Sequence, residues 1–71
     1  MPKFEKLQIV LALYDKLIKE GKVIMNDFIS EYEISVRSFR RYVSEINTFF
    51  CNEFMNEEIV YDYAEKAYKI K

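Results

Sequence analysis

The spacing of apolar residues changes once along this 71-residue sequence, and the change limits the folds that the chain can adopt. Over roughly the first fifty residues, apolar side chains recur every three or four positions, which is typical of amphipathic helices. From Ile59 to Lys71 they alternate, which is typical of strands that bury one face. The sequence therefore predicts an α+β domain, mainly helical, in which three helices precede a two-stranded hairpin and a short strand follows the first helix.

The first helix is predicted at residues 4–20, because this segment has neither glycine nor proline. Its apolar stripe consists of Phe4, Leu7, Val10, Leu11, Tyr14, Leu17 and Ile18. Gly21 follows at a position where helices commonly end with a positive φ. Ile9, Ala12 and Leu13 widen the apolar side, so we expect either the C-terminal strands or a second chain to cover them.

A short β-branched strand at residues 22–25 and a short helix at residues 26–32 are predicted next. Asn26 or Asp27 is suited to cap this helix. Its buried face should consist of Met25, Phe28, Ile29 and Tyr32.

A third helix is predicted at residues 35–50, after a tight turn that contains Glu33 and Ile34. Ser35 is suited to cap it, because a serine hydroxyl can accept a hydrogen bond from a free N–H group of the first turn. One face should be buried through Val36, Phe39, Val43, Ile46 and Phe50. This helix also contains every arginine of the sequence.

The opposite face of the third helix carries the candidate functional residues. Helical spacing places on it Arg37, Arg41, Ser44 and Thr48, with Arg40 and Asn47 beside them. A guanidinium group can bond two atoms of a guanine edge or neutralise a phosphate, and small hydroxyl side chains can bond either. This pattern indicates a helix that contacts DNA. A solvated helix face is the alternative, because clustered charges usually face water.

Composition narrows the classes of function. The formal charge of -1 argues against nucleic-acid binding, because modules that bind nucleic acids are usually basic. Positive charge is nevertheless concentrated in residues 35–50, which contain three arginines and one glutamate. One cysteine, Cys51, and no histidine leave neither an internal disulfide nor a Cys/His zinc site. We expect no cofactor and no enzymatic activity, because glycine-rich phosphate loops and activated nucleophiles are lacking. Without a signal peptide or long apolar run, we expect a cytoplasmic protein that does not enter the membrane.

The alternating C-terminal segment, residues 59–71, is predicted to form a hairpin. Ile59, Tyr61 and Tyr63 share one side of its first strand, Tyr68 and Ile70 share one side of its second, and residues 64–66 form the turn. A hairpin of this length is not stable alone, so we expect it to lie against the helices.

The order of these elements is that of a winged helix-turn-helix. The run from Val23 to Ile46 resembles the N-terminal domain of DeoR-type and WYL-type bacterial transcriptional regulators. In that family a valine–serine pair opens the recognition helix, followed by an arginine, a small hydroxyl residue, an apolar residue and two basic residues. The matching run here is Ile34-Ser35 and Arg37-Ser38-Phe39-Arg40-Arg41, and residues 59–62 and 67–70 resemble the two wing strands.

This resemblance implies a small transcriptional regulator, bacterial or phage, that binds operator DNA, usually as a dimer. The recognition helix would enter the major groove and the wing would contact the backbone. The residues that the resemblance places at the DNA are Ser35, Arg37, Ser38, Arg40 and Arg41, with Lys66 in the wing.

Three features depart from the family pattern. Glu33 stands where the turn usually has a glycine, and a glutamate at positive φ would be strained by about 1 kcal/mol. Ala67 stands at the customary wing glycine, and Asp62 and Glu65 would repel phosphate. Family members also carry a sensor or dimerisation domain after the wing, whereas this sequence stops at Lys71, so we expect the sensing chemistry to be absent from it.

A winged-helix module that binds protein instead of DNA is the alternative function. The slightly acidic composition supports it, as does an apolar surplus at Ile9, Leu13, Phe49, Phe54 and Met55. The partner would be a second copy, a larger regulator or a nucleoprotein complex. A complex that survives high salt would favour protein contact, because DNA binding weakens as salt rises.

Overall fold

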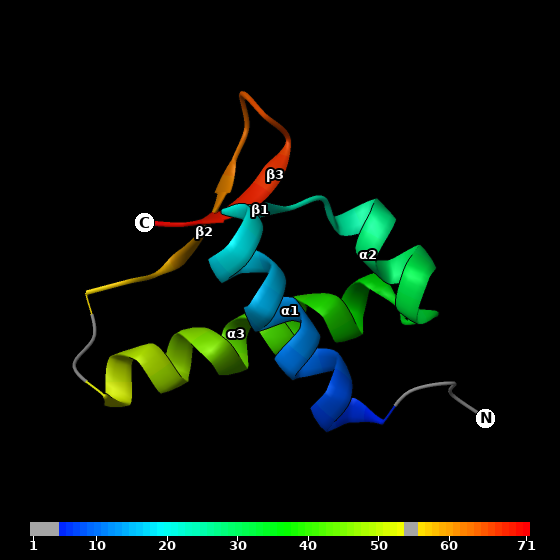
Figure 1. Ribbon diagram of the computed structural model, residues 1–71, viewed down its shortest axis with the longest axis horizontal. Helices are drawn as coiled ribbons and strands as arrows, with labels where there is room; N and C mark the ends of the chain where they lie inside the picture. Colours follow the sequence, from blue (N-terminus) through cyan, green and yellow to red (C-terminus); the bar gives the residue numbers. More distant parts are fainter. Residues whose placement is uncertain (1–4, 54–55) are drawn as a thin grey trace.

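The computed structural model describes residues 5–53 and 56–71 (Figure 1). Within these residues, three helices and a three-stranded antiparallel sheet form a small, mostly helical α+β domain. The elements follow in the order α1 (Lys6–Glu20), β1 (Lys22–Val23), α2 (Met25–Tyr32), α3 (Val36–Asn52), β2 (Ile59–Asp62) and β3 (Ala67–Ile70). The predicted α+β class and the predicted order of helices and strands are confirmed.

The end of α1 follows the prediction. Gly21 has a φ of 79°, in the left-handed region, and its N–H donates to the Leu17 carbonyl oxygen at 3.1 Å. The described helix starts at Lys6, and the predicted start at residue 4 lies outside the described residues.

The buried face of α1 overlaps the predicted stripe only in part: Leu17 is buried as predicted, and Val10 and Tyr14 pack against the core. Its buried residues are Ile9, Leu13 and Leu17. Three members of the predicted stripe are exposed instead, namely Leu7, Leu11 and Ile18. Spacing alone does not distinguish the buried side, because apolar residues occupy two neighbouring sides of this helix. Ile9 and Leu13 are covered by the chain itself, so the predicted partner surface is wrong at these two positions.

α2 begins one residue earlier than predicted, and Ile24 occupies its cap position without a side-chain hydrogen bond. The predicted caps Asn26 and Asp27 are wrong, because both residues lie inside the helix. The strand before it is shorter than predicted, since β1 ends at Val23.

α3 begins directly after Ser35, whose Oγ accepts a hydrogen bond from the Ser38 N–H at 3.0 Å. The predicted cap is therefore confirmed. The predicted buried face is confirmed at Phe39, Val43, Ile46 and Phe50. The prediction is wrong for Val36, because this first residue of the helix lies at the edge of the core and is 37% exposed. The helix also runs two residues beyond its predicted end.

The sheet has three strands where a two-stranded hairpin was predicted, because β1 pairs with β3. The strand order is β1-β3-β2, with Lys22 opposite Lys69 and Ile59 opposite Ile70. Tyr63 lies in the turn of the hairpin, since β2 ends one residue before it. The short first strand therefore ties the β2–β3 hairpin to the end of α1.

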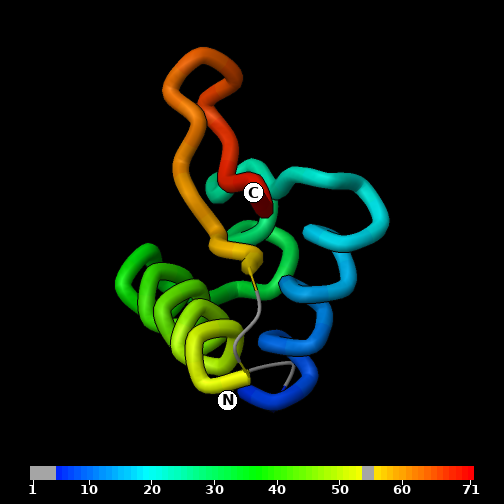
Figure 2. The backbone as a smooth tube through the Cα atoms, turned by 90° about the vertical axis from the view of Figure 1, so that its left-hand side faces the viewer, coloured from blue at the N-terminus to red at the C-terminus, as the bar shows by residue number. Residues whose placement is uncertain are grey.

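All six elements contribute to one core. The largest fully buried side chains are Phe28, Phe39, Phe50, Ile9, Leu13 and Leu17. In Figure 2, α1 and α3 lie on two sides of the domain, below the projecting hairpin. Asn47 of α3 binds the start of β2, because its Oδ1 accepts from the Ile59 N–H at 2.7 Å and its Nδ2 donates to the Ile59 carbonyl oxygen at 3.1 Å. This pair of hydrogen bonds fixes the hairpin relative to α3.

Candidate functional site

The arginine face of α3 consists of Arg37, Arg40, Arg41, Ser44 and Thr48, all of which are exposed. Four of them follow one another at intervals of four, three and four residues, so they lie along one side of the helix. This side is opposite the buried residues of α3. The structure therefore brings these predicted site residues together on one surface.

The arginines and the lysines differ in their partners. Five lysines form ion pairs with carboxylates, namely Lys6, Lys16, Lys19, Lys22 and Lys69. Within residues 5–53 and 56–71, no ion pair or side-chain hydrogen bond involves Arg37, Arg40 or Arg41. The three guanidinium groups are therefore free to bind an anion from outside the domain.

The only carboxylate side chain within α3 belongs to Glu45, and it is already neutralised. Its Oε1 lies 3.0 Å from Lys6 Nζ, which comes from the first turn of α1. The same ammonium group lies 5.9 Å from the centre of the Tyr42 ring. Glu45 therefore does not cancel the positive charge of the arginine face.

Most hydroxyl groups of α3 and its cap already form hydrogen bonds within the chain, whereas the guanidinium groups form none among the described residues. Ser35 Oγ donates to Ser38 Oγ at 3.1 Å in addition to capping the helix, and Ser38 is half-buried. Thr48 Oγ1 donates to the Ser44 carbonyl oxygen at 3.0 Å. In the described part of the chain, Ser44 is the only one of these four residues whose hydroxyl neither donates nor accepts a hydrogen bond. Ser44 is thus the hydroxyl best placed to contact a ligand.

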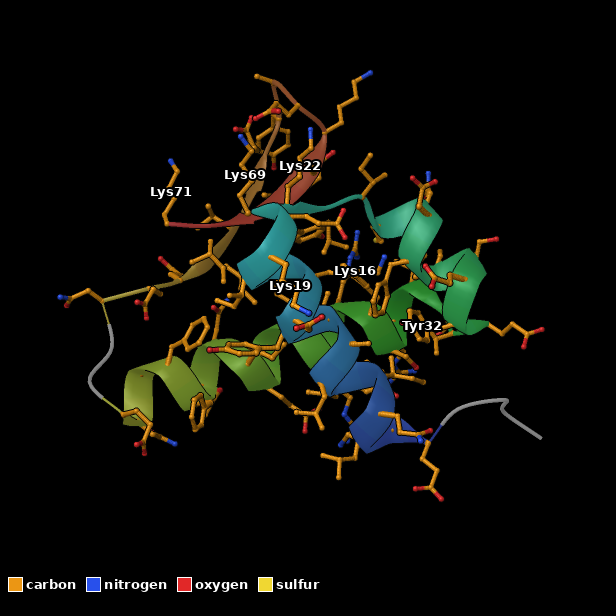
Figure 3. All side chains as sticks on the ribbon, in the orientation of Figure 1. Lys16, Lys19, Lys22, Tyr32, Lys69 and Lys71 are labelled. Atoms are coloured by element: carbon orange, nitrogen blue, oxygen red, sulfur yellow. The ribbon has the colours of Figure 1, made fainter. Side chains whose placement is uncertain are left out.

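In the turn of the β2–β3 hairpin Lys66 is exposed, and the acidic side chains nearby already have hydrogen-bond or ion-pair partners. Asp62 Oδ1 accepts from the N–H groups of Ala64 and Glu65 at 2.9 and 3.1 Å, and its Oδ2 lies 3.5 Å from Lys69 Nζ. Glu65 pairs with Lys69 and, at 3.3 Å, with Lys22. Figure 3 shows these two lysines beside each other on neighbouring strands. The expected repulsion of phosphate by these carboxylates is therefore weakened.

Two non-glycine residues have positive φ in the described chain, and both lie in turns. Glu33, with φ 55° and ψ 45°, follows α2, and its N–H and that of Ile34 both donate to the Ile29 carbonyl oxygen. The turn thus keeps the geometry that glycine favours, and the strain of about 1 kcal/mol expected for glutamate is retained. In the hairpin the positive φ falls on Lys66, at 54°, because Ala67 is a buried strand residue.

A series of aromatic contacts links the helices to the hairpin, and the sequence reasoning did not anticipate it. Phe28 meets Phe39 at 5.7 Å between ring centres, and Phe39 meets Tyr68 at 5.1 Å. Tyr68 meets Tyr61 at 5.1 Å, and Tyr61 meets Tyr63 at 4.7 Å. The alternation of tyrosines in the C-terminal segment was the available signal, although Tyr61 and Tyr63 are themselves exposed. These contacts hold the turn of the hairpin in place relative to α3.

An apolar groove of about 390 Å³ lies between α1 and α3. Its lining residues are Val10, Leu11, Tyr14, Glu45, Ile46 and Phe49. Phe49, a predicted partner contact, is 54% exposed here, whereas Phe54 and Met55 lie outside the described residues.

Searches against protein-family models, curated proteins and solved structures found no match to this chain. No helix in residues 5–53 or 56–71 is both long and apolar enough to cross a membrane. A functional assignment therefore depends on the residues and geometry described above.

Proposed function

We propose that this protein binds double-stranded DNA through the arginine face of α3 and regulates transcription. One observation carries the proposal: Arg37, Arg40 and Arg41 gather on an exposed helix face and have no anionic partner in the described chain. Most of the described lysines, in contrast, form ion pairs with carboxylates of the same domain. Free guanidinium groups on one helix face suit the phosphates and guanine edges of a DNA groove.

The net charge of -1 does not oppose this function, because the negative charges are placed elsewhere. α3 has three arginines and one glutamate, and that glutamate is paired with Lys6. A local positive surface on a slightly acidic body still attracts DNA at short range, since the Debye length is about 8 Å at physiological salt. The acidic body would in turn limit binding to unrelated DNA.

In this proposal α3 is the recognition helix and the β2–β3 hairpin is the wing of a winged helix-turn-helix. Arg37, Arg41 and Ser44 would contact base edges in the major groove, and Arg40 would contact a phosphate. Lys66, which has no ion pair among the described residues, would contact the backbone from the wing. The three helices, the tight turn at Glu33 and the hairpin pinned by Asn47 supply the scaffold that such a role requires.

The test is fluorescence anisotropy of a labelled duplex of mixed sequence, at low and at physiological salt. We expect salt-sensitive binding by the unmodified chain and its loss in the Arg37→Ala/Arg41→Ala variant, since released counterions drive such binding. The matched control is Lys16→Ala/Lys19→Ala, which removes the same charge from α1 (Figure 3) and should bind normally. Equal affinity of the arginine variant and the unmodified chain, with both folded by circular dichroism, would refute the proposal.

A protein-binding module is the second candidate, and the groove between α1 and α3 favours it. Its signature would be a complex that persists in high salt, because apolar contact is not weakened by screening. The two functions use different surfaces and can occur in one protein.

A further inference from the structure

The turn of the β2–β3 hairpin carries an aromatic ring that the core does not use. Among the large hydrophobic residues exposed in the described chain, Tyr63 is the most exposed, at 83%. It is the first residue of the turn, which comprises residues 63–66. Figure 2 shows this turn projecting beyond the three helices. The ring is therefore open to a partner from outside the domain.

Tyr63 is held in place although it is exposed. Its ring packs against that of Tyr61 at 4.7 Å between ring centres, with 82° between the ring planes. Tyr61 contacts Tyr68, which in turn contacts the buried Phe39. The backbone of the turn is held as well, by two hydrogen bonds to Asp62 Oδ1. A ring that is already positioned loses less conformational freedom when it binds a partner.

The charges of the turn suit an anion beside this ring. Lys66 is exposed in the same turn and forms no ion pair or side-chain hydrogen bond with a described residue. The carboxylate of Glu65 pairs with Lys22 and Lys69, and that of Asp62 also pairs with Lys69. The free charge of the turn is therefore positive.

A single ring beside a free ammonium group fits a nucleotide better than it fits a protein. A tyrosine side chain buries about 150–250 Å², whereas each partner in a stable protein interface buries about 800 Å². Among the described exposed hydrophobic residues, only Tyr61 accompanies Tyr63 on the hairpin. A nucleotide, in contrast, needs only a ring on which its base can stack and a cation for its phosphate.

We propose that Tyr63 stacks on the face of an unpaired nucleobase at a junction between double-stranded and single-stranded DNA, while Lys66 contacts the adjoining phosphate. Inside an intact duplex each base is covered by its neighbours, so the ring finds a free face only where the stack is interrupted. The inference rests on the proposed function, because the arginine face of α3 would hold the duplex beside the junction. The preference would not depend on which base is unpaired, because every base has a π face.

Fluorescence anisotropy with two labelled DNAs tests the inference. Both are duplexes with a short single-stranded tail, but in one of them the tail lacks its bases and keeps its phosphates. We expect the unmodified chain to bind the tail with bases about tenfold more tightly, and Tyr63→Ala to lose this preference, since a base stacks favourably on an aromatic side chain. The matched control is Phe49→Ala, which removes an exposed ring from α3 and should keep the preference.

Two further variants separate stacking from simple apolar contact. Tyr63→Phe should keep the preference, because stacking requires the ring and not the hydroxyl group, whereas Tyr63→Leu should lose most of it. Equal affinity of the unmodified chain for the two tails would overturn the proposal, as would a preference that persists in Tyr63→Ala or Tyr63→Leu.

A blunt duplex distinguishes this failure from a failure of the proposed function. If only the junction preference is wrong, Arg37→Ala/Arg41→Ala will still bind the blunt duplex less tightly than the unmodified chain does. If only the arginine face is wrong, that variant will bind the blunt duplex normally, and the preference for the tail with bases will remain. A chain that binds none of the three DNAs would overturn both proposals.

Discussion

The cationic side chains of α3 carry the same charge as those of α1 and the sheet, but the two sets differ in whether a carboxylate of the domain pairs with them. Lys16, Lys19 and Lys22 each lie within 4 Å of a carboxylate oxygen, and they stabilise the domain or its surface. Arg37 and Arg41 on α3 have no such partner in the described chain. The difference shows that a net charge near zero conceals two populations of cations, and only the unpaired one is suited to bind a polyanion. Four predictions test this difference, from the largest expected effect to the smallest.

The first prediction separates the two populations by DNA affinity. Arg41→Ala should weaken binding by about 1–3 kcal/mol if the guanidinium contacts a base. Arg41→Lys should keep the salt dependence but lose discrimination between bases, because an ammonium cannot form the bidentate contact. Lys19→Ala, measured by the same anisotropy titration, should change affinity by less than about 0.5 kcal/mol. An equal loss in Lys19→Ala would remove the distinction between the two populations.

The second prediction compares two polar residues on the same side of α3. Asn47→Ala should lower the free energy of unfolding by about 1–2 kcal/mol, because the N–H and carbonyl groups of Ile59 lose their partners. Arg40→Ala, one heptad earlier, should change it by less than about 0.5 kcal/mol. Urea unfolding measures both, and a similar loss for Arg40→Ala would mean that this arginine is structural.

The third prediction concerns lysines of the hairpin. Lys69→Ala should destabilise the domain by about 0.5–1 kcal/mol, because Lys69 pairs with both Asp62 and Glu65. Lys66→Ala should leave stability unchanged, since Lys66 has no ion pair in the described chain. The difference between the two variants should shrink in 1 M salt, where the Debye length is about 3 Å. A difference that is insensitive to salt would assign the effect to packing.

The fourth prediction extends the comparison to carboxylates. Glu33→Gly should stabilise the domain by about 0.5–1 kcal/mol, because it relieves the positive φ of 55° and breaks no ion pair. Glu31→Gly should destabilise it by about 1 kcal/mol, since Glu31 lies in α2 and pairs with Lys16 at 3.5 Å. Thermal unfolding of the two variants should therefore shift in opposite directions, and a destabilised Glu33→Gly would contradict the strain at that turn.

Local patterns predicted much of this fold. Ser35 was identified as a cap because serine, an apolar periodicity and a preceding turn coincide within a few residues. The buried face of α3 followed in the same way, with only Val36 wrong. α1 was harder, because Leu11 and Leu13 are equally apolar and only the surrounding elements determine which of them is buried.

The ion pairs between distant parts of the chain could not be predicted from the sequence. Lys6 meets Glu45 across 39 positions of the chain, and Lys22 meets Glu65 across 43. Such contacts are set by the packing of α1 on α3 and of β1 on the hairpin, which no local pattern specifies. The arginine face could be proposed from spacing alone, but its lack of partners became visible only in three dimensions.

The strand order of the sheet has a consequence for the synthesis of the protein. β3 occupies the centre, between β1 and β2, yet residues 67–70 leave the ribosome after all the other elements. Neither outer strand can pair until β3 has emerged, so the sheet will form late, while helices made of local contacts form early. The helices can therefore form before the sheet covers its side of the core.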